Sequence, residues 1–89
     1  MNKTQTVDLL YFAWVRERMG HGRETVAVPE HVETVADLMT WLSARDERSA
    51  AAFAHPSTVR AAIDRVHAQP GARLAGAREI AFFPPVTGG

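Results

Sequence analysis

The C-terminal residues carry the chemistry that this sequence offers. Residues 80–89 read Ile-Ala-Phe-Phe-Pro-Pro-Val-Thr-Gly-Gly and hold no charged side chain, so the α-carboxylate of Gly89 is the ionised group expected there. A carboxylate is a poor acyl donor because its leaving group would be oxide. Joined to AMP from ATP it becomes a mixed anhydride, which a sulfur nucleophile can attack. The product is a C-terminal thiocarboxylate, so we expect Gly89 to carry sulfur.

The residues before Gly89 predict a thin arm that can enter another protein. Pro84 and Pro85 lack amide donors and hold φ near −65°, so a strand cannot continue through them. Six residues from Pro84 onward span roughly 20 Å when extended. A plain frayed end is the alternative, but the stiff exit and the uncharged spacer favour a function. We expect a tail of residues 84–89 after a domain of residues 1–83, with tail insertion through Pro84, Pro85, Val86, Thr87 and Gly88.

Composition limits the other classes of function. Eighty-nine residues make one domain, and a formal net charge of zero gives no reason to expect a nucleic acid or a membrane surface as partner. With no cysteine, disulfides and thiolate sites are excluded. The four histidines have no metal-ligand spacing, so we expect no metal and no bound cofactor. The N-terminal residues do not resemble a secretion signal, and we expect a cytoplasmic protein.

The elements that must position the tail can be read from apolar periodicity. Residues 7–12 predict a strand, residues 13–20 one or two helical turns, and residues 24–28 a hairpin partner strand. Thr34 is a good N-cap for a helix that fades near Arg45. Residues 46–58 form a connection with a short helical turn over residues 50–53. Residues 79–83 predict a final buried strand.

The order of these elements predicts an α+β fold with one main helix packed across a mixed sheet. The first and last strands are the most apolar, so we expect them to be parallel neighbours at the sheet centre. Residues 59–68 are ambiguous, because Val59, Ala62, Ile63 and Val66 fit a helical stripe.

Two stretches carry a family resemblance. The tail Ala-Phe-Phe-Pro-Pro-Val-Thr-Gly-Gly at 81–89 closely resembles the C-terminus of the small subunit of molybdopterin synthase (MoaD type). The opening Leu-Leu-Tyr-Phe-Ala-Trp-Val-Arg-Glu at 9–17 is similar to that family's first strand and turn. The likeness implies a β-grasp, ubiquitin-like fold, and therefore a strand rather than a helix within residues 59–68. Asp64 stands where the family commonly has Asn.

The resemblance also implies a reaction and its partners. In that family an ATP-dependent activating enzyme adenylates the terminal glycine, a sulfur-donor protein supplies sulfur, and the thiocarboxylate donates it to cyclic pyranopterin monophosphate. The large synthase subunit, usually in a heterotetramer, would supply the active-site groups, so we expect no active site on this chain. Rival interpretations are the thiamin-thiazole sulfur carrier, a ubiquitin-like protein modifier and a plain binding module.

Four residues are candidates for the partner interface: Phe12, Arg16, Val66 and Phe83. The apolar three are expected near the tail exit, although each taken singly is more typical of the core. Arg16, with Glu17 and Arg18, predicts either a recognition patch or a solvated ion pair. Trp14 and Trp41 are expected to pack against the core.

Overall fold

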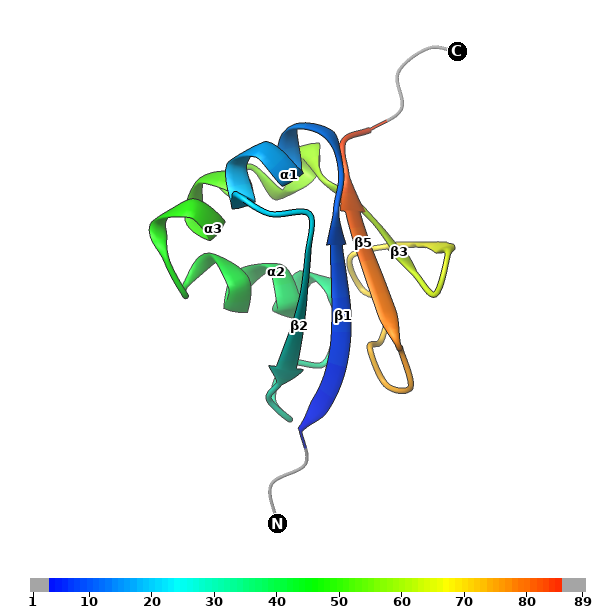
Figure 1. Cartoon of the computed structure of the whole chain (residues 1–89). Helices are drawn as coiled ribbons and strands as arrows, with labels where there is room; N and C mark the ends of the chain where they lie inside the picture. The colour runs from blue at the N-terminus through cyan, green and yellow to red at the C-terminus, as the bar shows by residue number, and fades with distance from the viewer. Residues whose placement is uncertain (1–3, 86–89) are drawn as a thin grey trace.

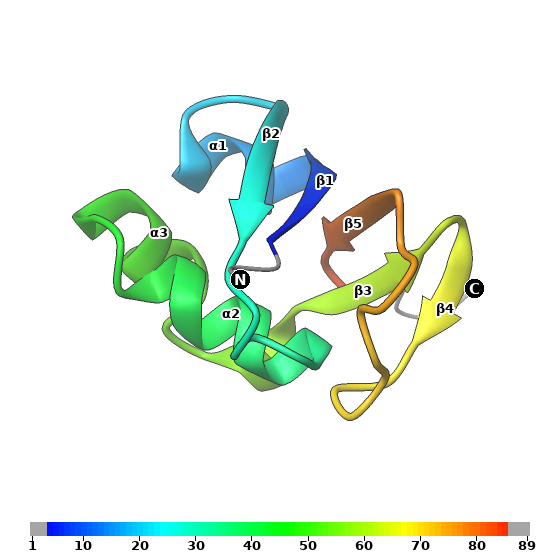
Figure 2. The same cartoon turned by 90° about the horizontal axis from the view of Figure 1, so that it is seen from below.

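The computed structural model describes residues 4–85 and builds them into one mixed sheet with helices on one face (Figures 1 and 2). In chain order the elements are β1 (Gln5–Tyr11), α1 (Ala13–Met19), β2 (Arg23–Val28), α2 (Val35–Ser43), α3 (Glu47–Ala52), the 3-10 turn η1 (Pro56–Thr58), β3 (Arg60–Ile63), β4 (Val66–Ala68) and β5 (Glu79–Phe83). The strands lie in the order β2-β1-β5-β3-β4. This confirms the predicted β-grasp arrangement.

The sheet centre is made by the first and last strands, as predicted. β1 pairs parallel with β5 through the register Leu9↔Ile80 and Tyr11↔Phe82, and antiparallel with β2. Leu9, Tyr11, Ile80 and Phe82 all point into the core and are at most 1% exposed. Alternate residues face the other way, because successive side chains on a strand point to opposite faces. Figure 2 shows α2 and α3 on the concave side of the curved sheet.

The main helix α2 begins where its capping residues dictate. The Thr34 hydroxyl accepts a hydrogen bond from the Asp37 backbone N–H at 3.1 Å, and the Asp37 carboxylate accepts one from the Thr34 N–H at 3.2 Å. These reciprocal bonds satisfy two amides that the first helical turn leaves without partners. The buried face of α2 then covers the sheet through Val35, Leu38, Met39 and Leu42.

The strand expected within residues 59–68 from the family resemblance is confirmed, and the helical stripe that periodicity allowed does not form. The segment forms a hairpin, in which β3 and β4 pair through Ala61↔Ala68 and Ile63↔Val66. The strand that the family resemblance implied is thus two strands joined by a two-residue turn. Asp64 and Arg65 make this turn with positive φ values of 48° and 72°. The segment forms strands rather than a helix because β3 is hydrogen-bonded on both edges, to β4 and to β5.

The connection after α2 is also more regular than predicted. The short helix α3 covers Glu47–Ala52 rather than residues 50–53, because the Asp46 carboxylate caps it by accepting the Ser49 N–H at 2.7 Å. Trp14 and Trp41 pack partly buried against the core, as expected. Among residues 4–85, no helix has the length and apolar character to cross a membrane.

Candidate functional site: the tail exit and the open sheet face

The strand that leads into the tail is firmly anchored. Phe82 is fully buried, its ring stacks on Tyr11 at a centroid distance of 6.2 Å, and it meets Phe53 edge-on at 5.1 Å. Its carbonyl accepts a 3.0 Å hydrogen bond from the Phe12 N–H. Aromatic pairs of this kind stabilise beyond their area burial. The chain therefore leaves the domain from a rigid point.

β5 ends at Phe83, and Pro84 and Pro85 follow it without regular secondary structure. This agrees with the predicted end of the strand at the two prolines, which cannot donate to a sheet ladder. The rest of the predicted insertion segment, Val86, Thr87 and Gly88, lies outside the described residues together with Gly89. Figure 1 shows β5 emerging beside the start of α1.

An apolar surface surrounds the exit on the sheet face that the helices leave uncovered. Strand alternation and the cross-strand register place one set of residues on this face. We call it the open face: Leu10, Phe12, Arg60, Ala62, His67, Ala81 and Phe83. Leu10, Ala62, Ala81 and Phe83 are half-buried, and Phe12 is 49% exposed.

Phe12 and Phe83 are neighbours on the open face. The parallel register pairs Tyr11 with Phe82, so the next residues along both chains lie side by side. Phe12 keeps an extended backbone, with φ −123° and ψ 153°, before α1 begins. The ring of His67, from β4, meets the Phe83 ring at 6.1 Å. The structure thus brings two predicted interface residues together at the tail exit.

Val66, the third apolar candidate for the interface, does not lie on the open face with Phe12 and Phe83. It pairs with Ile63, which pairs with the fully buried Ile80, so Val66 lies on the helix-covered side of the sheet. It is 69% exposed because it sits at the outer edge, beyond the cover of the helices. The expected position of Val66 beside the tail exit is therefore wrong. Neither Val66 nor Phe12 is a buried core residue, so the alternative that each belongs to the core is also wrong.

Arg16 lies on the exposed side of α1, one turn after Phe12. Its guanidinium folds over Gly22, where a Cβ would come within 3.1 Å of the Arg16 Nε. The ion pairs found within residues 4–85 include none from Arg16, Glu17 or Arg18, so the predicted solvated ion pair does not form. Arg18 instead lies over the Trp14 ring at 5.2 Å.

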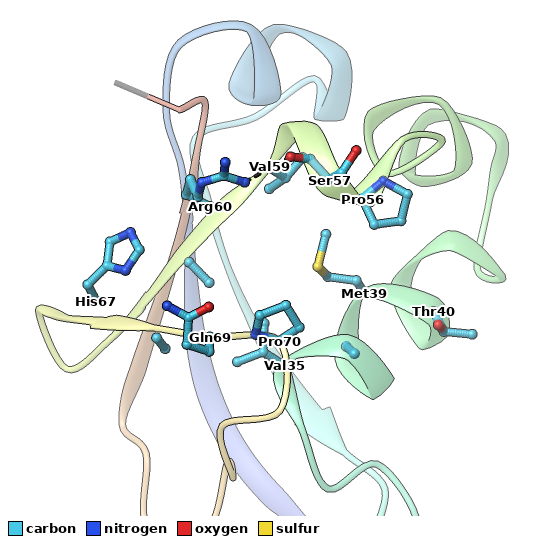
Figure 3. Close-up of a pocket in the computed structure, with 13 residues that line it drawn as sticks. Val35, Met39, Thr40, Pro56, Ser57, Val59, Arg60, His67, Gln69 and Pro70 are labelled. Carbon is cyan, nitrogen blue, oxygen red and sulfur yellow. Dashed lines mark hydrogen bonds between the residues drawn. The ribbon is translucent and has the colours of Figure 1, made fainter. Parts of the chain in front are cut away.

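A groove of about 700 Å³ opens between α2, η1 and the β3–β4 hairpin (Figure 3). Its apolar lining includes Val35, Met39 and Val59. Arg60 and His67 stand at its rim, and both also border Phe83. The groove and the open face are thus adjoining surfaces that share these two side chains.

A polar cluster, which the sequence did not reveal, lies at the far edge of the sheet. Glu24 accepts hydrogen bonds from the Tyr11 hydroxyl at 2.7 Å and from both terminal nitrogens of Arg45 at 3.2 and 2.9 Å. His21 Nε2 lies 3.2 Å from the same carboxylate.

Burial alone would raise the pKa of Glu24, but hydrogen bonds from Arg45, Tyr11 and His21 outweigh it and lower the pKa to about 2. Burial, followed by the bond to Glu24, raises the pKa of Tyr11. The cluster ties β1 and β2 to the end of α2 and is structural. Groups of His, Asp and Glu that could hold a metal ion are not found within residues 4–85.

Known proteins resemble this chain over almost its whole length. A curated relative from Mycosarcoma maydis, described as a molybdopterin synthase sulfur carrier subunit, is 36% identical over 92 residues, covering 99% of this chain and 98% of that protein. The crystal structure of SAMP1 from Haloferax volcanii superposes with a TM-score of 0.70 at 23% identity, covering 96% of this chain and 100% of that one.

A second solved structure is a putative molybdopterin converting factor, subunit 1, from Pyrococcus furiosus. It gives a TM-score of 0.69 at 22% identity, covering 91% of this chain and 98% of that one. At these identities the two structures show the fold alone. The model of the ThiS family matches residues 9–89, and the chain therefore belongs to the ThiS family.

Proposed function

We propose that this protein is the sulfur-carrier subunit of a molybdopterin synthase. The observation that carries the proposal is the 36% identity, over nearly the full length of both chains, to a protein described in those words. The Gly-Gly end and the two prolines that follow the last strand provide what such a role requires. An anchored strand, a stiff exit and a slim uncharged tip can present a carboxyl group inside another protein.

The proposed chemistry takes place on the α-carboxyl of Gly89. A carboxylate oxygen attacks the α-phosphorus of ATP on an activating enzyme, and pyrophosphate leaves. Hydrosulfide delivered by a donor protein then attacks the carbonyl carbon, the C–O bond to AMP breaks with AMP leaving, and a thiocarboxylate remains after a proton is lost to solvent. The thiocarboxylate donates its sulfur to cyclic pyranopterin monophosphate. ATP is used by the activating enzyme, and this chain needs no cofactor of its own.

The large synthase subunit is the proposed partner, and the open face is the proposed contact. The exposed Phe12 and the half-buried Phe83 lie side by side at the tail exit, and aromatic side chains are typical interface anchors. Arg16, one turn along α1, has no ion-pair partner among residues 4–85 and offers a charge at the rim. Docking there would aim Pro84, Pro85, Val86, Thr87 and Gly88 into the partner.

The intact mass of the protein tests the proposal. The chain is incubated with ATP, the activating enzyme of its own organism and a sulfur source. A gain equal to the replacement of one oxygen by sulfur supports a carrier, and deletion of Gly88 and Gly89 should abolish that gain without changing the circular dichroism spectrum. Stable isopeptide adducts on lysines of other proteins, with no thiocarboxylate, would favour a ubiquitin-like modifier instead.

A reconstitution separates the two carrier pathways. The thiocarboxylated protein is offered either the large synthase subunit with cyclic pyranopterin monophosphate or the enzyme that forms the thiamin thiazole. Sulfur transfer in the first mixture supports the proposal. Transfer in the second mixture alone would assign the protein to the thiazole pathway.

A further inference from the structure

The groove between α2, η1 and the β3–β4 hairpin has the size and the lining of a binding site. It encloses about 700 Å³, within the roughly 300–1,000 Å³ that is usual for ligand pockets. Its floor is apolar, because Val35, Met39 and Val59 line it and each is at most 6% exposed. Figure 3 shows the Met39 side chain reaching from α2 toward the centre of the groove. A methionine adapts its shape to what it contacts, so this floor can bury an apolar side chain of another molecule.

The rim of the groove is basic. Arg60 and His67 line it, and the lining residues within 4–85 include no Asp or Glu. Arg60 donates a 2.8 Å hydrogen bond from Nη1 to the Ser57 carbonyl, and a guanidinium has five N–H donors. The ion pairs found in the described part of the chain include none from Arg60. A carboxylate that approached the rim would therefore meet charged donors, which make the stronger class of hydrogen bond.

The groove is continuous with the open face. Arg60 pairs in register with Phe83, and the His67 ring meets the Phe83 ring at 6.1 Å, so the two basic side chains border both surfaces. Figure 3 shows both residues on the side of the groove that faces β5. A protein seated on the open face would reach the groove past Arg60 and His67. This continuity favours a segment of a docked protein over a free small molecule.

We propose that the groove binds an acidic, apolar segment of the large synthase subunit. An apolar side chain of that segment lies over Met39 and Val59, and a carboxylate of the segment pairs with Arg60. The inference rests on the function proposed above and extends the proposed contact from the open face into the groove. Val66, at the far end of the hairpin, is not among the residues that line the groove and stays outside this contact.

Charge changes at two exposed lining residues test the proposal. Thr40 lies on α2 and Gln69 follows β4, so they line the groove from opposite sides, and neither belongs to the open face. Glu and Lys are introduced in turn at each position. Both residues suit an exposed helix site, and Gln69→Glu changes the charge with almost no change of shape. An acidic segment is repelled by the Glu variants and tolerated or attracted by the Lys variants.

Titration calorimetry with the large subunit measures the affinities. Thr40→Glu and Gln69→Glu should each bind about 10-fold or more weakly than the Lys variant at the same position, since like charges placed together oppose association. The difference should shrink when the salt concentration rises from about 0.05 M to about 0.5 M, because salt screens the repulsion. Ala50→Glu and Ala50→Lys are the matched controls, because Ala50 is exposed on α3 and does not line the groove.

The outcomes separate this inference from the proposed function. If the unaltered chain binds the large subunit but the Glu and Lys variants at Thr40 or Gln69 differ no more than the Ala50 pair, the inference is overturned and the proposed function stands. Tighter binding of the Glu variants would indicate a basic segment and would also overturn it. So would a charge effect seen only with the activating enzyme. If the unaltered chain does not bind the large subunit, the proposed function fails and this inference falls with it.

Discussion

The backbone N–H of Phe12 donates a 3.0 Å hydrogen bond to the carbonyl of Phe82. This bond joins the N-cap residue of α1 to Phe82, the last buried residue of β5, which directly precedes Phe83 of the open face. Phe12 and Phe83 are therefore held in one place by the fold itself. The same relationship positions both the proposed docking surface and the root of the tail.

Phe12→Ala and Phe83→Ala should each weaken association with the large subunit by about 10- to 100-fold, the usual cost of truncating a buried interface aromatic. Titration calorimetry with the large subunit measures the affinity. Val66→Ala is the matched control, because Val66 is an exposed apolar side chain on the opposite face. Equal losses in all three variants would show that the open face is not the interface.

Glu24→Gln should destabilise the fold at neutral pH and reduce its sensitivity to acid. The pKa of Glu24 is about 2 in the folded protein against a usual value of 4.5. Its stabilising contribution is therefore complete above pH 4.5 and lost as the pH falls toward 2. We expect Glu24→Gln to lower the free energy of unfolding at pH 7 by about 1–2 kcal/mol, which allows for solvent screening of a partly exposed group.

Urea denaturation at pH 7, 4 and 2.5 measures this effect. Glu33→Gln, which removes an exposed pairing with Arg73, is the control and should change stability by less than about 0.5 kcal/mol. Parallel pH profiles for the unaltered protein and Glu24→Gln would contradict the role assigned to the cluster.

Arg65→Gly should stabilise the hairpin by about 0.5–1 kcal/mol. Arg65 has a φ of 72°, a left-handed conformation that costs a side-chain-bearing residue about 1–2 kcal/mol and glycine much less. A rise in Tm of a few degrees is expected by calorimetry.

Asp64→Gly is the contrasting variant for this turn. The Asp64 carboxylate accepts the N–H groups of Arg78 and Glu79 at 3.0 and 2.9 Å, so its removal should lower the Tm although Asp64 also has a positive φ. A rise in Tm for both variants would show that backbone strain alone governs the turn.

Thr34→Ala should cost about 1 kcal/mol, because it removes the capping bond at the start of α2. Thr40→Ala, on the exposed middle of the same helix, should be close to neutral. The free energy of unfolding from urea titration distinguishes them. Similar values for the two variants would mean that the capping box adds nothing measurable.

The sequence predicted the elements whose patterns are local and uninterrupted. Residues 7–12 are rich in strand-forming side chains, and Thr34 is an N-cap signal that needs no tertiary information. Both predictions are confirmed. The anchoring strand of the tail was equally clear, because Pro84 and Pro85 mark where pairing must stop.

Periodicity alone left residues 59–68 ambiguous because their strand identity depends on distant partners. Ala62 and Ile63 fit a helical period, and the turn at Asp64 and Arg65 lacks the glycine that would have marked a hairpin. Pairing of Ile63 with Ile80, far along the chain, decides the outcome. The same pairing decides the face of Val66, which periodicity could not assign.

The polar cluster could not be predicted either. Tyr11, Glu24 and Arg45 come from three elements, and nothing in their spacing indicates that they meet. The open face was predicted in part, through Phe12 and Phe83. Leu10, Ala62 and Ala81 join it only through the register of three strands.

A single-turnover transfer tests the central claim most directly. The protein, thiocarboxylated at Gly89 and freed of other sulfur sources, is mixed with the large subunit and cyclic pyranopterin monophosphate. Product sulfur and the residual thiocarboxylate are then quantified by mass spectrometry. We predict that each sulfur gained by the pterin is matched by one thiocarboxylate returned to carboxylate. Retention of sulfur on the protein, or equal product from a chain that lacks Gly88 and Gly89, would contradict the account.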